Sequence, residues 1–134
     1  MDAQTARERV VRAPVGHLAT VTSDGRPHVV PCCFVLVGRW IYSAVDTKPK
    51  STLALRRLEN IRAHPTVALL VDHYDEEWSE LWWVRVDGDA QLWESGARRE
   101  EAVAALAAKY RQYREVPPPG AVVAVEATRW QWWP

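Results

Sequence analysis

The alternation of apolar and polar residues predicts a chain built mainly of strands. Short runs with a two-residue period, or with continuous apolar character, are separated by turn-forming residues. We expect six strands, over residues 15–22, 28–37, 40–45, 66–72, 81–93 and 121–133. Apolar residues at helical spacing predict three helices, over residues 5–13, 51–63 and 97–113.

The order of these elements indicates the architecture. Short turns join the early strands, which favours antiparallel hairpins. Pro31 inside the second strand predicts an edge position or a bulge, and Gly88 predicts a bulge in the fifth strand. A Rossmann sheet does not fit, because strands and helices do not alternate regularly and no glycine-rich fingerprint is present. We therefore expect one mainly β (α+β) domain over residues 1–134, a six-stranded antiparallel barrel, closed or split, with peripheral helices.

Composition narrows the class of partner. The 134 residues carry 17 basic and 17 acidic side chains, and this balance argues against a general nucleic-acid binder. No segment has the apolar length needed to cross a bilayer, and the first residues lack a signal-peptide pattern. Cys32 and Cys33 are adjacent, and a disulfide between neighbours is strained. We expect a cytoplasmic protein with no membrane partner and reduced cysteines.

Eight tryptophans outnumber tyrosine, phenylalanine and methionine combined. Large aromatic side chains in this number indicate a subunit interface, a pocket for a flat ligand, or both. Trp78 lies in a charged loop, so it is a candidate lid that stacks over a flat ring as well as a candidate for burial against a partner. No histidine or cysteine spacing matches a metal motif.

The segment at 46–52 carries the most specific charge pattern. Two of the three lysines, Lys48 and Lys50, lie here at the start of a predicted helix, next to the hydroxyls of Ser51 and Thr52. Free N–H groups and the helix dipole favour an anion at such a point, and the added cations suggest a phosphate cradle. The alternative is a helix capped by Ser51 or Thr52 with two solvated lysines.

An arginine on the same helix can extend the cradle. Arg56 and Arg57 point about 100° apart on a helix, so both do not serve one site. Arg57 lies closer to the helical face of Ser51, and its planar guanidinium can form a bidentate contact with a phosphate. We therefore favour Arg57, with a solvated surface arginine as the alternative.

Four motifs follow one another along the chain: an opening hairpin (Gly16–Val21 with residues 24–31), a strand–loop–helix (residues 46–69), a bulged strand (residues 86–90) and a terminal strand (residues 129–132). Their order resembles that of the pyridoxamine 5'-phosphate oxidase-like split-barrel flavoproteins, in which the strand–loop–helix holds the cofactor phosphate. Within the superfamily, the run Leu70–Trp78 followed by Leu81–Arg85 looks most like the branch that depends on the deazaflavin coenzyme F420. The resemblance extends from Gly16 to Trp132.

This resemblance implies a homodimer with two cofactor sites at the subunit interface. It implies that Lys48, Lys50, Ser51 and Thr52, with Arg57, hold the cofactor phosphate, and that the strand through Pro31, Cys32 and Cys33 flanks the ring. We assign no catalytic side chain and no metal, because in such enzymes the cofactor carries the hydride and the protein positions it.

The function expected from this resemblance is an F420-dependent oxidoreductase. It would transfer a hydride between the deazaflavin and a small unsaturated or conjugated substrate. Three alternatives stay open: an FMN-dependent oxidoreductase of the same fold, a non-catalytic protein that binds the cofactor or haem, and a structural dimer whose basic turn only caps a helix.

Overall fold

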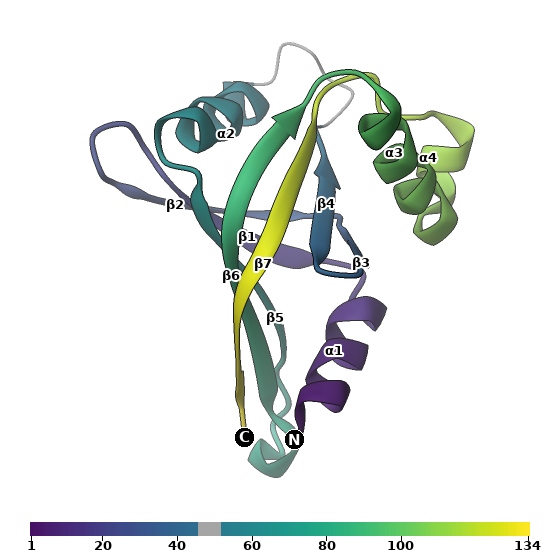
Figure 1. The fold of residues 1–134 in the computed structure, drawn as a ribbon. Helices are drawn as coiled ribbons and strands as arrows, with labels where there is room; N and C mark the ends of the chain where they lie inside the picture. Colours follow the sequence, from purple (N-terminus) through teal and green to yellow (C-terminus); the bar gives the residue numbers. More distant parts are fainter. Residues whose placement is uncertain (46–51) are drawn as a thin grey trace.

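The computed structural model describes residues 1–45 and 52–134, with the backbone alone at 52–55. Helices and strands follow the order α1 (Ala3–Arg12), β1 (Gly16–Val21), β2 (Pro27–Cys32), β3 (Val35–Val37), β4 (Trp40–Ala44), α2 (Thr52–Ala63), β5 (Thr66–His73), the short 3-10 helix η1 (Trp78–Glu80), β6 (Trp82–Trp93), α3 (Ala97–Lys109), α4 (Arg111–Glu115) and β7 (Val122–Trp133). The strands form one antiparallel sheet, and helices pack around it (Figure 1). The mainly β class is therefore confirmed.

The described residues form seven strands, not the six expected, because the predicted strand at 28–37 is two strands. Neighbours in the sheet follow the order β2-β1-β5-β6-β7-β4-β3. Strands β2 and β3 therefore lie at opposite edges of the sheet, although only Cys33 and Phe34 separate them in the chain. So short a connection brings the two edges together at that end, which curls the sheet into a split barrel. Pro31 lies in the edge strand β2, as its missing N–H predicts.

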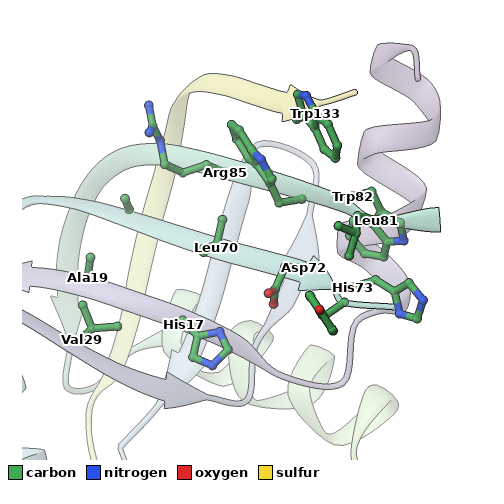
Figure 2. A pocket seen from close by; sticks show the side chains of 13 residues that line it. His17, Ala19, Val29, Leu70, Asp72, His73, Leu81, Trp82, Arg85 and Trp133 are labelled. Atoms are coloured by element: carbon green, nitrogen blue, oxygen red, sulfur yellow. The ribbon is translucent and has the colours of Figure 1, made fainter. Parts of the chain in front are cut away.

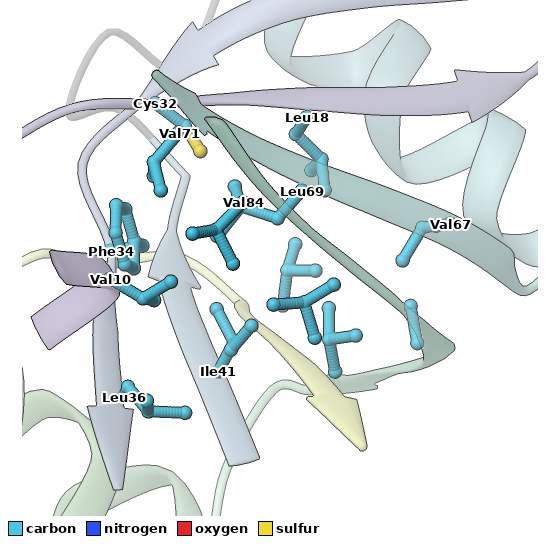
Figure 3. Close-up of a cluster of buried hydrophobic side chains, with 14 of the residues drawn as sticks. Val10, Leu18, Cys32, Phe34, Leu36, Ile41, Val67, Leu69, Val71 and Val84 are labelled. Atoms are coloured by element: carbon cyan, nitrogen blue, oxygen red, sulfur yellow. The ribbon is translucent and has the colours of Figure 1, made fainter. Parts of the chain in front are cut away.

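The hydrophobic core fills the inner face of this curled sheet (Figure 3). Alternate residues of β1, β5 and β6, such as Leu18, Leu69 and Val84, point inward and are at most 2% exposed. Helix α1 adds Ala6 and Val10 to the same cluster, and α2 adds Ile61. The two helices close the core from different ends of the sheet (Figure 1).

Helix α3 packs on the other face of the sheet, against β3, β4 and β7. It ends at Lys109, earlier than the predicted helix over 97–113, because Tyr110 takes an extended conformation (φ −117°, ψ 119°) before α4 begins. Helix α1 begins at Ala3, earlier than expected, because the Asp2 carboxylate accepts a hydrogen bond from the Thr5 N–H at 2.8 Å. Among the described residues, no helix is both long and apolar enough to cross a membrane.

The sheet has a bulge at Gly88, as predicted, but the extra residue belongs to the partner strand β7 and not to the strand of Gly88. Asp87 pairs with Arg129 and Gly88 with Ala127, so Thr128 of β7 is the extra residue. A side chain at position 88 would place its Cβ 2.4 Å from the Glu126 carbonyl oxygen. Glycine is therefore required where the long strands β6 and β7 approach and bend.

Candidate functional site

The predicted phosphate cradle is only partly visible. Lys48, Lys50 and Ser51 lie outside the described residues, and Thr52 is described only as the first residue of α2. The predicted site residues whose side chains the structure describes are Arg57, Pro31, Cys32, Cys33 and Trp78.

Arg57 of α2 is buried, whereas its neighbour Arg56 is exposed. Only 8% of Arg57 is accessible to solvent. Its Nε atom is buried and has no hydrogen-bond partner among the residues that the structure describes. A buried guanidinium with an unused donor is costly, because the lost hydration is not replaced. This donor is therefore the strongest sign of an anion site in the chain.

Further buried polar groups lie on α2 and on strands β1 and β2. Asn60 lies one turn further along α2, and its Nδ2 donates to Thr20 Oγ1 at 3.1 Å. Thr20 and Asn60 are each 3% exposed. In the β1–β2 ladder Thr20 is paired with His28, so the two side chains share a face of the sheet. The Nδ1 atom of His28 is buried and has no partner among the described residues. We call Thr20, His28, Arg57 and Asn60 the α2 polar cluster.

The end of β2 lies beside this cluster. Pro31 is exposed, Cys32 is buried on the inner face and Cys33 is partly exposed. Burial raises the pKa of the Cys32 thiol, while the Ser43 hydroxyl and the positive charge of Arg57 act in the opposite direction. The positive charge of Arg57 therefore favours the thiolate form of Cys32, although burial has the larger effect.

A second polar cluster holds the chain just after Cys33. The Tyr110 hydroxyl accepts a hydrogen bond from the Phe34 N–H at 3.0 Å and lies 2.9 Å from the Phe34 carbonyl oxygen. Lys109 Nζ donates to the carbonyls of Phe34 and Ala13 at 2.8 and 2.7 Å. Burial lowers the pKa of Lys109 to about 8 and raises the pKa of Tyr110 to about 12. These contacts replace the ladder bonds that the chain loses where β2 ends.

A groove of about 760 Å³ opens on the outer face of β1, β5 and β6 (Figure 2). Its lining is mainly apolar and aromatic, with a few polar side chains. The lining includes His17, Leu70, Asp72, Trp82, Arg85 and Trp133. Val29 and Trp133 on its rim are 61% and 47% exposed. His73 stacks on Trp82 with ring centroids 6.1 Å apart. A concave apolar surface of this size fits a flat ligand or a second protein surface.

Trp78 lies away from the α2 polar cluster within one chain. It begins η1, which follows β5, whereas α2 precedes β5. The eight residues of β5 span about 26 Å, so the two segments lie near opposite ends of that strand. Trp78 is 70% exposed. A lid over a ring held near Arg57 would therefore require the Trp78 of a second copy.

Sequence analysis missed three members of the α2 polar cluster and the Lys109–Tyr110 pair. Asn60 was detectable, because a polar residue three positions after Arg57 occupies the same helical face. Thr20 and His28 gave no such signal, since their roles depend on the pairing of β1 and β2. Among the described residues, no group of three histidine, cysteine, aspartate or glutamate side chains is placed to hold a metal ion.

Comparison with known families gives one match. The model of the family described as pyridoxamine 5'-phosphate oxidase matches residues 3–134. No curated protein matches the chain at a significant level.

Several solved structures share the fold. A conserved hypothetical protein of Mycobacterium tuberculosis, Rv2991, is 22% identical with a TM-score of 0.80, over 99% of this chain and 84% of that one. The FAD-binding protein of Mycobacterium smegmatis is 22% identical with a TM-score of 0.66, over 99% and 95%. A haem-binding protein of the same species is 20% identical with a TM-score of 0.76, over 96% and 52%. At these identities the likeness shows the fold alone.

Proposed function

Because the chain belongs to the pyridoxamine 5'-phosphate oxidase family, we propose that it is an oxidoreductase that binds a phosphorylated deazaflavin or flavin. The cofactor we favour is F420, as the branch-specific run Leu70–Trp78 suggests, and FMN is the alternative. The substrate is a small unsaturated or conjugated molecule. The observation that carries the proposal is the buried Arg57 Nε with no partner among the described residues.

The described residues would serve such a cofactor in separate ways. Arg57 would bind the phosphate, with Lys48, Lys50, Ser51 and Thr52 as the further contacts predicted from sequence. The backbone from Pro31 to Cys33, held by the Lys109–Tyr110 contacts to Phe34, would flank the ring. When bound, the ring supplies the hydride chemistry, so the protein needs no catalytic triad.

A second copy of the chain would complete the site. The groove on the outer sheet face has exposed apolar walls, and pairing this face with a second copy would remove them from water. Pairing would also allow Trp78 of one copy to approach the α2 polar cluster of the other. The proposed assembly is therefore a homodimer with the cofactor at the interface.

The first experiment is a parallel titration of cofactor-stripped protein with F420 and FMN, followed by fluorescence. Tight F420 binding with weak FMN binding supports the favoured cofactor, and tight FMN binding alone supports the alternative. If the protein binds neither F420 nor FMN, both cofactor assignments are contradicted. Lys50→Ala should weaken binding far more than it changes stability, and unchanged affinity would remove Lys50 from the site.

The oligomer has its own test. Leu70→Arg places a charge in the groove, so it should give a monomer by light scattering and weaken cofactor binding. Val37→Arg is the matched control, because Val37 is also an apolar strand residue, 45% exposed, but lies outside the groove lining. A dimeric Leu70→Arg variant would show that this face is not the interface.

Haem binding without catalysis is the second candidate. It is favoured by the apolar groove, which includes His17 and His73 in its lining, since imidazole is a common haem ligand. Titration with haemin distinguishes it. A sharp Soret band that is lost in His73→Ala or His17→Ala would favour haem, and unchanged spectra would contradict it.

A further inference from the structure

Three backbone groups at the corner between β2 and β3 are bonded by side chains. Ser43 Oγ donates to the Cys33 carbonyl at 2.8 Å, and the Phe34 N–H donates to the Tyr110 hydroxyl at 3.0 Å. The Phe34 carbonyl accepts from Lys109 Nζ at 2.8 Å. Phe34 and Ser43 are 0% and 3% exposed, so a peptide group that lost its partner here would stay unsatisfied.

The Tyr110 hydroxyl has one hydrogen and two carbonyls within reach. Its oxygen lies 2.8 Å from the Pro14 carbonyl oxygen and 2.9 Å from that of Phe34. Because Lys109 donates to the Phe34 carbonyl, the hydrogen of Tyr110 is available for Pro14. The Phe34 N–H donates to Tyr110 and to no other described residue. The position of the peptide N–H of Phe34 therefore depends on one hydroxyl.

The backbone at the end of α3 sets the place of this hydroxyl. Helix α3 ends at Lys109, and Tyr110, in an extended conformation, directs its hydroxyl to Phe34 before α4 begins. The ring of Tyr113 on α4 meets the Tyr110 ring edge-on, with centroids 5.7 Å apart. Burial raises the pKa of Tyr110 to about 12, so the hydroxyl keeps its hydrogen throughout the neutral pH range.

The corner follows the end of an edge strand. Strand β2 pairs with β1 on one side, and its other side has no ladder partner among the described strands. Residues 31–33 lie at the end of this strand, and they are the segment that the proposed function places against the cofactor ring. Because no second strand holds that side, the contacts of the corner fix the path of this segment.

We propose that Tyr110 is a positioning residue for the cofactor ring. Its hydroxyl holds the Phe34 N–H, and this contact fixes the backbone at 31–33 where the ring would lie. The proposal rests on the proposed function, because it requires a ring at that segment. A backbone that is already in place loses less conformational entropy when the ring binds. The phosphate has no part in this contact, so Tyr110 should affect ligands with and without a phosphate alike.

The first test titrates Tyr110→Phe with FMN and with riboflavin, which is the same ring without the phosphate. The Kd of both ligands should rise by the same factor, about tenfold, as expected for the loss of one hydrogen bond. The visible absorption band of bound FMN should move toward that of free FMN, because the ring is held less firmly. If F420 binds in place of FMN, its Kd and absorption band are measured instead.

Tyr42→Phe is the matched control for these titrations. Tyr42 is also a partly buried tyrosine, but it lies on β4, where its ring stacks on Trp40 with centroids 6.4 Å apart. Removal of its hydroxyl should leave the Kd values and the absorption band as they are in wild type. Thermal unfolding of both variants without ligand shows that each is folded.

The second test needs no cofactor and follows amide hydrogen exchange by NMR. Exchange at Phe34 should be about tenfold faster in Tyr110→Phe, because the N–H has lost its acceptor. The Leu69 amide, in the core of β5, reports global unfolding and should change less. This comparison separates a local loosening of the corner from a general loss of stability.

The binding and exchange results together separate the positioning role from the proposed function. Unchanged Kd values and an unchanged absorption band in Tyr110→Phe, with normal binding by wild type, would overturn the positioning role and leave the proposed function intact. Equal acceleration at Phe34 and Leu69 would also overturn it, because the hydroxyl would then serve overall stability alone. If wild type binds none of FMN, F420 and riboflavin, the proposed function is contradicted and the positioning role falls with it.

Discussion

Two cationic side chains approach the chain where β2 passes into β3, and their environments differ. Lys109 donates to the carbonyls of Ala13 and Phe34, and its Nζ lies 4.0 Å from the centroid of the Phe34 ring. The positive charge of Arg57, on α2, acts to lower the pKa of the Cys32 thiol. Its Nε has no hydrogen-bond partner among the described residues. Lys109 therefore has hydrogen-bond acceptors within the fold, whereas the Nε–H of Arg57 has none among the described residues.

This difference separates structure from function. The contacts of Lys109 join the residue after α1 to the β2–β3 connection, so its burial is offset by hydrogen bonds and an aromatic face. Arg57 occupies a helix face that could have carried an apolar residue, as Val10 does on α1. Retaining a buried guanidinium whose Nε–H has no partner among the described residues costs stability, and an anionic ligand would offset that cost. The predictions below test this contrast.

The largest effect is expected at Arg57. Arg57→Met should make the free energy of FMN binding less favourable by about 1.5–3 kcal/mol, because a charged hydrogen bond to the phosphate is lost. The free energy of unfolding without ligand should stay the same or rise, since a buried charge is replaced by an apolar chain. Isothermal titration and urea unfolding measure the two quantities. A variant that is strongly destabilised but binds FMN normally would make Arg57 structural.

Lys109→Met should show the opposite pattern. Loss of its hydrogen bonds leaves the Ala13 and Phe34 carbonyls without that donor, which should cost about 2 kcal/mol of unfolding free energy. The ratio of FMN to riboflavin affinity should not change, because Lys109 contacts backbone and not ligand. A lower ratio in this variant would place Lys109 in the phosphate site and remove the contrast.

A smaller effect is expected at Thr20. Thr20→Val removes the acceptor of the Asn60 amide and should cost about 1 kcal/mol of stability. It should also weaken FMN binding slightly, by loosening the spacing between β1 and α2. Thr20→Ser keeps the hydroxyl and is the control; equal behaviour of the two variants would show that the hydrogen bond does not matter. Urea unfolding and FMN titration measure both effects.

The smallest effect is a dependence on pH. Burial lowers the pKa of Lys109 to about 8 from 10.5, so the unfolded chain binds more protons than the folded one between these values. Stability should therefore rise as pH increases through this window. Tyr110 has the opposite effect at higher pH. Burial raises its pKa from 10.0 to about 12, so above pH 10 the folded chain keeps a proton that the unfolded chain loses, and stability falls as pH rises. Urea unfolding at pH 7.5 and 9.5 should show a rise in wild type that is smaller in Lys109→Met. An equal rise in wild type and in Lys109→Met would show that groups other than Lys109 cause the pH dependence of stability.

Several features were predictable from local patterns. Pro31 indicated an edge strand, because proline cannot donate to a ladder, and Gly88 indicated the bulge. Of the two adjacent arginines, helical geometry favoured Arg57, which is the one that is buried. Neighbouring residues of an extended chain point to opposite faces, and accordingly Cys32 is buried while Cys33 is partly exposed.

Other features were not predictable because they depend on contacts between distant residues. The apolar run at 28–37 looks continuous, and its division into β2 and β3 reflects pairing with β1 at one edge and β4 at the other. The end of α3 depends on Tyr110, whose hydroxyl reaches Phe34, 76 positions away. The place of Trp78 depends on the direction of β5.

The sequence by itself determined the class of fold and most of its elements, because apolar periodicity, proline and glycine act within a few residues. It also marked Arg57 and the basic segment before α2 as candidates for an anion site. Only the tertiary structure joined Asn60 to Thr20 and paired Thr20 with His28, since helix docking and strand pairing join residues up to 40 positions apart. Burial then distinguished the two cations, because an unsatisfied donor is costly only where water is excluded.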